Sequence, residues 1–268
     1  MKNISILGCG WLGLPLASHF CNKGFEVKGS TTSADKFSQI QEVGAQAYLV
    51  DLPHSFEVGF LKDADIIIIN IPPQTRKKGK DFHKACIEQI IPHIASNTKI
   101  IYVSATSVYP DLNQPIDESI PVDKDSERAQ ALWQAENLLK ENCPDQTCIL
   151  RFGGLLGYDR IPGKYFAGKE VDTPDERVNY IHRDDAIGII SRLVEDKFDV
   201  DIYNGVAPLH PTKKEVYLNN AEQFKFDDPI FEPKANQLKN RYIDSQKVVS
   251  KLGYSFIYPD PLRFHYTK

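Results

Sequence analysis

Short apolar stretches alternate with stretches of helical spacing along the first half of this 268-residue chain. Four consecutive isoleucines, at positions 66–69, are typical of a strand that is buried on both faces of a parallel sheet. Alternation of this kind predicts an α/β fold with a doubly wound parallel sheet, because a helix supplies the crossover that joins two parallel strands. The expected strands are residues 4–7, 25–29, 47–50, 66–69, 99–103 and 147–152, and the expected helices are residues 14–21, 34–43, 82–95 and 127–140.

The first expected strand leads into a glycine-rich turn that opens the first helix. The turn reads Gly-Cys-Gly-Trp-Leu-Gly, which is the G-x-G-x-x-G spacing. In this setting Gly8 permits a tight turn, Gly10 lets the main chain approach a pyrophosphate, and Gly13 lets the helix pack close to the strand. Trp11 and Leu12 lie where a helix N-terminus offers its amide groups to phosphates. The sequence therefore predicts a dinucleotide-binding loop, with a purely structural glycine turn as the alternative.

The end of the second strand carries hydroxyls and a lysine instead of an acid. A carboxylate about 20 residues beyond the loop would bind the ribose of NAD. The sequence has Thr31 and Thr32 in this region, with Lys36 one helical turn further on. These donors favour NADP over NAD, because they can bond a 2′-phosphate that a carboxylate would repel. Thr32 or Ser33 can also cap a helix here, and the two roles can coexist.

Residues that follow the next strands complete the predicted cofactor site. Ligands of open α/β sheets bind beyond the carboxyl ends of the strands. We expect Asp51 and Leu52 to meet the adenine of the dinucleotide. Ile71 and Pro72 should border its nicotinamide end, and Ser104 follows the fifth strand at the same edge.

The composition is that of an ordinary globular chain and excludes several classes of protein. Hydrophobic residues make up 41% and charged residues 25%, which excludes a disordered or fibrous chain. Lysine and arginine total 32 against 36 acids, a net charge of −4, and no basic tail is present, which argues against a nucleic-acid partner. No apolar run approaches the ~20 residues that a bilayer requires, and glycines interrupt the N-terminal stretch that could imitate a signal peptide. Five scattered cysteines without a C-x-x-C pair, and histidines without metal-binding spacing, predict a cytoplasmic protein with reduced thiols and no metal.

Several later segments occur in the order found in one known family. Residues 102–110 read Tyr-Val-Ser-Ala-Thr-Ser-Val-Tyr-Pro, residues 149–154 read Ile-Leu-Arg-Phe-Gly-Gly, and residues 180–186 read Tyr-Ile-His-Arg-Asp-Asp-Ala. With the glycine loop, these segments resemble the short-chain dehydrogenases/reductases, in the extended-like branch of the NAD-dependent epimerase/dehydratase type. The resemblance covers essentially the whole chain and implies an NAD(P)-binding Rossmann fold.

The sequence changes character after Phe152, where glycines and prolines become frequent. We expect residues 1–155, completed by about 179–204, to form the NAD(P)-binding Rossmann domain. Residues 156–178 and 205–268 should form a small, irregular substrate-binding lobe.

The family's catalytic Tyr-x-x-x-Lys pair is missing from the helix that should carry it. Counting back from Glu136, which matches a family glutamate, Arg128 stands at the tyrosine position and Leu132 at the lysine position. Arginine stays protonated and cannot act as a base near neutral pH. The chain therefore resembles the atypical members that retain dinucleotide binding. A literal Tyr-x-x-x-Lys at residues 165–169 contains a glycine that disfavours a helix, and we interpret it as coincidence.

Other residues are then candidates for contact with the substrate. The family's catalytic serine position holds an alanine, which leaves Thr106 and Tyr109 as the nearest proton donors. Arg128 and Arg160 are candidates for binding an anionic substrate, since Arg160 falls where extended family members contact a substrate phosphate. The basic run at residues 76–80 is either a lid over such a substrate or a solvated loop.

One histidine lies beside two acids, in His182-Arg183-Asp184-Asp185. This grouping suggests acid–base or metal chemistry, but residues at this spacing more commonly fix the start of a helix. Asp184 is the natural capping residue in that interpretation.

The sequence leaves two functions open. In the first, the protein is an NAD(P)-dependent oxidoreductase or epimerase that acts on a small, anionic, nucleotide-sugar-like substrate. In the second, it is a non-catalytic sensor of the dinucleotide. Family analogy further suggests a homodimer.

Overall fold

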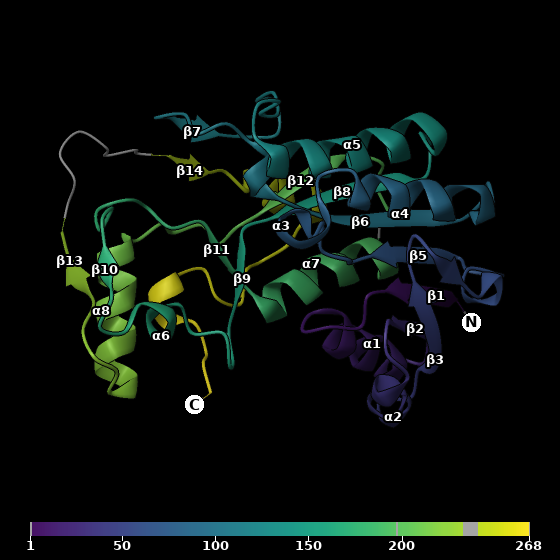
Figure 1. Cartoon of the computed structure of the whole chain (residues 1–268), viewed down its shortest axis with the longest axis horizontal. Coiled ribbons are helices and arrows are strands. Elements are labelled where there is room, and N and C mark those ends of the chain that lie inside the picture. Colours follow the sequence, from purple (N-terminus) through teal and green to yellow (C-terminus); the bar gives the residue numbers. More distant parts are fainter. Residues whose placement is uncertain (1, 197, 233–240, 268) are drawn as a thin grey trace. The chain divides into compact units, whose positions relative to one another are not determined.

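The computed structural model describes residues 2–196, 198–232 and 241–267, and the chain forms two compact units (Figure 1). The first unit comprises Met1–Val108, Val122–Leu150 and Leu193–Ile202. The second comprises Tyr109–Pro121, Arg151–Arg192 and Tyr203–Lys268. In the described residues no helix is long and apolar enough to cross a membrane.

A mostly parallel sheet forms the frame of the fold, as the alternating pattern predicts. The strands β1, β2, β3, β5 and β6 pair in parallel, and the short β4 pairs antiparallel with β3 at the edge. Across the described part of the chain the strand order is β12-β8-β6-β5-β1-β2-β3-β4, so the winding direction reverses between β1 and β5. The bounds are β1 Asn3–Leu7, β2 Glu26–Thr31, β3 Gln46–Asp51, β4 Ser55–Phe56, β5 Ile66–Ile69, β6 Lys99–Ala105, β8 Thr147–Phe152 and β12 Ile202–Gly205.

Helices of the first unit cover both faces of its strands. Helices α4 and α5 pack against each other on one face, and α1 and α2 lie on the other (Figure 1). The predicted helix at 34–43 is divided into a 3₁₀ turn, η1, and the short α2. The predicted helix at 82–95 ends early, and a 3₁₀ turn that contains Pro92 follows, because proline cannot donate the next helical hydrogen bond. The bounds are α1 Gly13–Asn22, η1 Ala34–Lys36, α2 Phe37–Glu42, α3 Thr75–Lys78, α4 Phe82–Ile90, η3 Ile91–His93, η4 Thr106–Val108 and α5 Glu127–Asn142.

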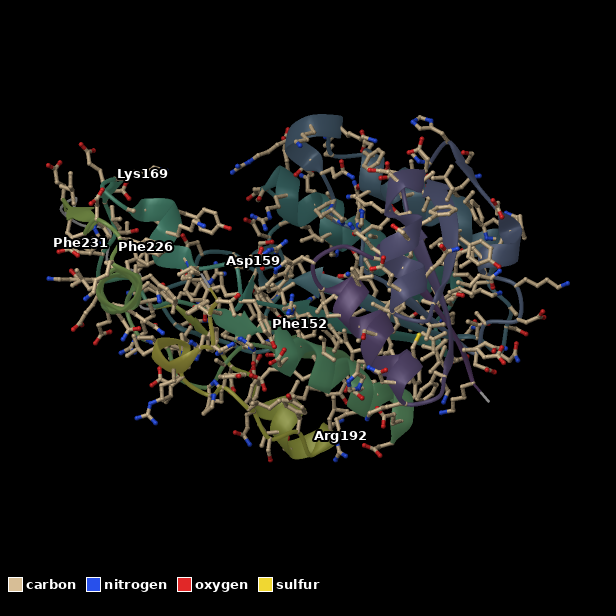
Figure 2. All side chains as sticks on the ribbon, turned by 90° about the horizontal axis from the view of Figure 1, so that it is seen from below. Phe152, Asp159, Lys169, Arg192, Phe226 and Phe231 are labelled. Atoms are coloured by element: carbon tan, nitrogen blue, oxygen red, sulfur yellow. The ribbon has the colours of Figure 1, made fainter. Side chains whose placement is uncertain are left out.

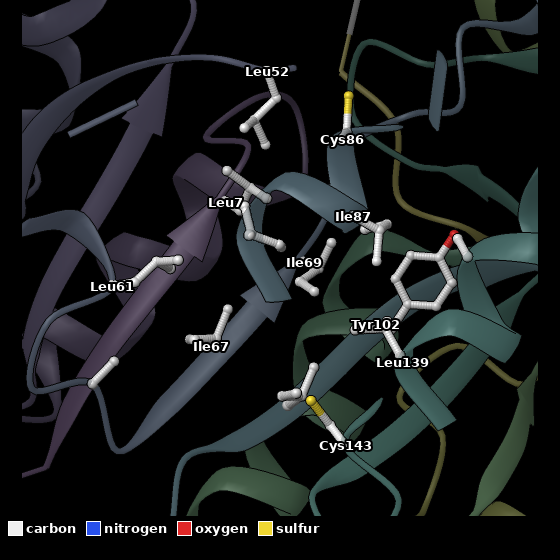
Figure 3. Close-up of a cluster of buried hydrophobic side chains, with 14 of the residues drawn as sticks. Leu7, Leu52, Leu61, Ile67, Ile69, Cys86, Ile87, Tyr102, Leu139 and Cys143 are labelled. Atoms are coloured by element: carbon white, nitrogen blue, oxygen red, sulfur yellow. The ribbon is translucent and has the colours of Figure 1, made fainter. Parts of the chain in front are cut away.

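The core of the first unit lies between the strands and the pair α4 and α5 (Figure 3). Ile67 and Ile69 of β5 meet Ile87 of α4, and Leu139 of α5 closes the same cluster. All four side chains are at most 1% exposed. Burying an aliphatic side chain of this size contributes about 1.5–3 kcal/mol, so this cluster holds the strand ends in place for a ligand site.

The second unit combines short strands with longer helices. Among its described residues, three two-stranded pairs lie outside the large sheet: β9 with β11, β10 with β13, and β7 with β14. The side chains of this unit include Phe152, Phe226 and Phe231 (Figure 2), and the rings of Phe166 and Tyr217 stack with centroids 4.8 Å apart. The bounds are β7 Pro115–Ile116, β9 Gly154–Leu156, α6 Pro162–Phe166, β10 Glu170–Val171, β11 Tyr180–His182, α7 Arg183–Glu195, α8 Lys213–Phe224, β13 Ile230–Phe231, β14 Tyr242–Ile243 and α9 Gln246–Leu252.

Candidate functional site

Each glycine of the loop after β1 has its own geometric reason to be glycine. Gly8 has a φ of +103°, and a Cβ there would lie 2.8 Å from the carbonyl oxygen of Asn70. A Cβ at Gly13 would collide with the carbonyl oxygen of Gly8. A Cβ at Gly10, by contrast, would meet no atom of the protein within 4 Å. The turn and the helix packing therefore require Gly8 and Gly13, whereas Gly10 keeps an exposed stretch of main chain open to a ligand.

Two polar side chains outside the motif fix this loop. The amide of Gly8 donates to the Ser30 hydroxyl at 2.8 Å, and the side-chain amide of Asn70 donates to the Gly8 carbonyl at 3.2 Å. Ser30 belongs to β2, and Asn70 directly follows β5. The glycine pattern does not point to either residue. The signal in the sequence that could have pointed to Asn70 is its position as a polar residue directly after a buried strand.

The first turn of α1 contains no acid and no side-chain cap, and among its amides that of Leu14 donates to the Gly10 carbonyl at 2.9 Å. Leu12 is the N-cap residue and makes no side-chain cap, and no acid lies in the first turn. Pro15 in that turn has no N–H to satisfy. Trp11, which precedes the cap, is half-buried. The partial positive charge of this helix end is therefore available to an anion beside Gly10.

The residues predicted to read the 2′-position lie at the exposed end of β2. The Thr31 hydroxyl accepts a hydrogen bond from the Ser33 amide at 3.2 Å, so it stabilises the turn. Thr32 and Lys36 are exposed. Ser33 precedes η1 and makes no side-chain cap, and its hydroxyl instead contacts the carboxylate of Asp35. A carboxylate thus lies next to the predicted phosphate-binding residues.

The predicted cofactor-binding residues after β3 and β5 differ in their exposure to solvent. Asp51 is half-buried, whereas Leu52 is 6% exposed and packs into the core cluster. Ile71 lies against the glycine loop, with its Cγ2 3.2 Å from the position of a Cβ on Gly8. Pro72 is exposed.

A buried polar pair lies at the carboxyl end of β6. Ser104 is 4% exposed and donates its hydroxyl proton to the carboxylate of Glu136 on α5, at 2.6 Å. Glu136 is itself 2% exposed. Thr106 is also buried, in η4, which packs against α5. Ser104 therefore ties β6 to the helix that should carry the catalytic pair.

The structure shows how Arg128 and Leu132, at the two positions where the sequence motifs predict that pair, lie on α5. Arg128 is exposed in the first turn, and Leu132 is 3% exposed. The α6 helix ends at Phe166 and Gly168 has a φ of +66°, so Tyr165 and Lys169 do not share one helix. In the described residues neither segment offers a helical Tyr-x-x-x-Lys.

In the second unit, the hydroxyl of Tyr109 belongs to a buried network. It donates to the side-chain oxygen of Asn204 at 2.8 Å, and the Arg151 guanidinium lies 4.9 Å from the centre of its ring. Burial raises the pKa of Tyr109 above its ordinary value, against the opposing effect of Arg151. These contacts weigh against Tyr109 as a proton donor near neutral pH.

His182 and Asp185 are used by the fold itself. Nε2 of His182 donates to the His265 carbonyl at 3.1 Å, and its Nδ1 accepts from the Asp184 amide at 3.2 Å, which defines a neutral ring. Burial lowers the pKa of His182 accordingly. Asp185 is fully buried and accepts from the Tyr254 hydroxyl at 2.8 Å and from the Ile257 amide at 2.7 Å.

The expectation that Asp184 caps this helix needs correction. Helix α7 begins at Arg183, so Asp184 lies within the first turn. The ring of His182 accepts a hydrogen bond from the Asp184 amide, as a capping side chain would. The carboxylate of Asp184 accepts from the Tyr158 hydroxyl instead, at 3.0 Å. Arg160 follows Tyr158 by two residues and is half-buried. The described residues contain no group of three or more side chains that could hold a metal ion.

Comparisons with known proteins agree with this geometry. The family model of the NAD binding domain of 6-phosphogluconate dehydrogenase matches residues 3–120. Protein YeeZ of Escherichia coli (strain K12) is 31% identical over 269 residues, which cover 98% of each chain.

Solved structures show the same fold at low identity. A conserved protein from Silicibacter pomeroyi superposes with a TM-score of 0.81 at 20% identity, covering 98% of this chain and 96% of that one. UDP-glucuronic acid 4-epimerase from Bacillus cereus, solved with UDP-glucuronic acid and NAD, gives a TM-score of 0.80 at 16% identity, covering 99% and 98%.

The loop, the sheet order and these matches define an NAD(P)-binding Rossmann protein with the fold of the NAD-dependent epimerases, as the sequence motifs predict. Within that class, the chain belongs to the family of Protein YeeZ.

Proposed function

We propose that this protein binds NADP(H) or NAD(H) at the glycine loop and acts on a small anionic substrate as an oxidoreductase or epimerase. The observation that carries the proposal is the difference among the three glycines, since only Gly10 has open space where a Cβ would stand. That space lies beside the N-terminal end of α1, which has no side-chain cap and is where a pyrophosphate would bind.

A substitution at Gly10 tests the binding step. Because a Cβ there would meet no protein atom within 4 Å, Gly10→Val should fold normally and still block a pyrophosphate. We expect its affinity for NADP to fall at least ~100-fold by calorimetric titration, which is about 2.7 kcal/mol. Unchanged affinity in a folded variant would remove the basis of the proposal.

The preference for NADP over NAD is part of the proposal. Thr31, Thr32 and Lys36 offer donors at the end of β2, whereas Asp35 adds a carboxylate that would oppose a 2′-phosphate. Lys36→Ala should weaken NADP about fivefold and leave NAD unchanged, since one exposed ion pair contributes up to ~1 kcal/mol. Tighter binding of NAD than of NADP by the wild type would overturn this preference.

Catalysis without the usual pair requires another proton donor, and we propose Thr106 as the first candidate. Tyr109 is the second candidate, and its bond to Asn204 favours a positioning role. Arg128 and Arg160 are each proposed as contacts for the anionic substrate, and residues 156–178 and 205–268 are proposed as a substrate-binding lobe. The Bacillus cereus epimerase, solved with a nucleotide sugar and NAD, supports this class of substrate.

The second function that the site supports is dinucleotide sensing without turnover. It is favoured by one observation, the apolar Leu132 that is buried where a catalytic lysine would stand. Incubation with NADPH and a panel of sugar nucleotides and carbonyl compounds separates the two functions through the absorbance of the reduced ring. Turnover supports the enzyme, and tight dinucleotide binding without turnover supports the sensor. A cytoplasmic location and a homodimer stay predictions.

A further inference from the structure

A dense group of cations follows β5 in the first unit. Arg76, Lys77, Lys78 and Lys80 are all exposed, within five residues of a chain whose net charge is −4. None of the four forms an ion pair with another described residue, and Asp81 is the only acid directly next to them in sequence. We call residues 76–80 the basic segment. Positive charge is thus concentrated here although the chain as a whole is acidic.

The basic segment follows, by five residues, the stretch of chain that contacts the dinucleotide loop. Asn70 donates to the carbonyl of Gly8 at 3.2 Å, and Ile71 lies against the same glycine. Arg76 is five residues beyond Ile71, so its Cα lies within ~18 Å of that contact even if the chain is fully extended. Helix α3, which carries most of the segment, also packs against α5, whose first turn contains Arg128.

The backbone gives the basic segment a defined shape. Gln74 and Gly79, on either side of α3, have φ values of +52° and +84°. The left-handed region is uncommon for a glutamine, so the turn at Gln74 is specified by its surroundings. The carbonyl of Gln74 accepts from the amides of Lys77 and Lys78, both at 2.9 Å. Consecutive basic side chains are therefore presented from a closed turn.

Lys78 lies over the ring of Phe82, 4.4 Å from its centroid, but no carboxylate in the described part of the chain offsets the four charges. Like charges in one turn repel one another, and a multivalent anion between them removes that repulsion. A phosphate is the biological anion that matches this arrangement, because it accepts several charge-assisted hydrogen bonds at once. We propose that the basic segment binds a phosphate group of a nucleoside-diphosphate-type substrate, separate from the pyrophosphate at the glycine loop. This inference rests on the proposed function only in that the substrate phosphate and the dinucleotide pyrophosphate are both assigned to the carboxyl edge of the sheet.

Titration of full-length protein with UDP, in the presence of saturating NADP, tests this site. The variant Arg76→Gln/Lys77→Gln removes two charges from the basic segment. The matched control, Lys62→Gln/Lys140→Gln, removes two charges from exposed lysines of the same unit. We expect the first variant to raise the dissociation constant of UDP roughly tenfold and the control to change it less than twofold. Uridine should bind equally weakly to all three proteins.

The arms of the experiment separate this inference from the proposed function. A wild type that does not bind UDP, or equal UDP affinity in both double variants, overturns the inference. A loss of NADP affinity as large as the loss of UDP affinity also overturns it, since the segment would then bind the dinucleotide. The affinity for NADP, measured without UDP, should be unchanged in Arg76→Gln/Lys77→Gln, because the glycine loop is intact in that variant. A wild type that binds UDP through residues 76–80 but binds no dinucleotide would sustain the inference and refute the proposed function.

Discussion

The glycine loop and the first turns of α5 are both candidate ligand-binding parts of the first unit. They differ in how closely their residues match the predicted motifs. At the loop, Gly8, Gly10 and Gly13 keep the family spacing, and the fold uses each one separately. On α5, Arg128 and Leu132 stand where the sequence motifs predict a tyrosine and a lysine. The loop is therefore defined by main-chain geometry, whereas the predicted role of α5 depends on the identity of its side chains. The two regions can therefore be tested separately.

The largest effect should come from the third glycine of the loop. In Gly13→Ala the new methyl group would collide with the Gly8 carbonyl, which is backbone and cannot rotate away. We expect the free energy of unfolding to fall by roughly 4 kcal/mol or more, measured by denaturant titration. Gly10→Ala is the control and should stay within ~0.5 kcal/mol. Equal stability of the two variants would contradict the separate roles of these glycines.

Acid should lower the free energy of unfolding through His83, a buried residue of α4. His83 is fully buried with Nε2 2.7 Å from the Tyr102 hydroxyl, and burial lowers its pKa from 6.5 to about 4. The unfolded chain gains the proton first, so the contribution of neutral His83 to stability is fully present above pH 6.5 and is lost as the pH drops toward 4. The loss from this one group is about 3 kcal/mol at most.

The measurement is the free energy of unfolding between pH 7.5 and pH ~4. In His83→Gln the acid-side slope should be shallower, while the slope due to other histidines remains. The same slope in both proteins would show that His83 does not stay neutral in the fold.

A smaller effect is expected at the junction of β6 and α5. Ser104→Ala removes a hydrogen-bond donor from the buried Glu136 carboxylate and should cost about 2 kcal/mol of stability. Ser107→Ala is the matched control, because the Ser107 hydroxyl is buried and has no partner among the described residues. It should cost less than ~0.5 kcal/mol by thermal or denaturant unfolding. If the two serines cost the same, the Ser104 bond does not tie β6 to α5.

The smallest effect should come from Arg128. It is exposed, so Arg128→Ala should change the stability by less than ~0.5 kcal/mol and the affinity for NADP less than twofold. Calorimetric titration with NADP provides the check. A large loss of NADP affinity would mean that the start of α5 is part of the cofactor site, and the distinction between the two regions would fail.

The sequence predicted the frame of this protein well. Apolar runs such as residues 66–69 are local, and a strand buried on both faces needs no distant information to be recognised. The order of motifs likewise indicated the epimerase-type Rossmann fold. Helix ends were predicted less well, because residues 34–43 divide into a 3₁₀ turn and a short helix that no local signal separates.

What the sequence alone determined is the alternation of strands and helices, the glycine turn, and the absence of a Tyr-x-x-x-Lys pair from residues 127–140, since each depends on residues that are close in the chain. Only the tertiary structure decided how the individual side chains are used. Asn70 and Ser30 reach Gly8 across 62 and 22 positions, and Asp185 is committed to a C-terminal segment more than 60 residues away. Whether a polar atom is free for chemistry depends on which distant donors and acceptors pack against it, and only folding brings those partners together.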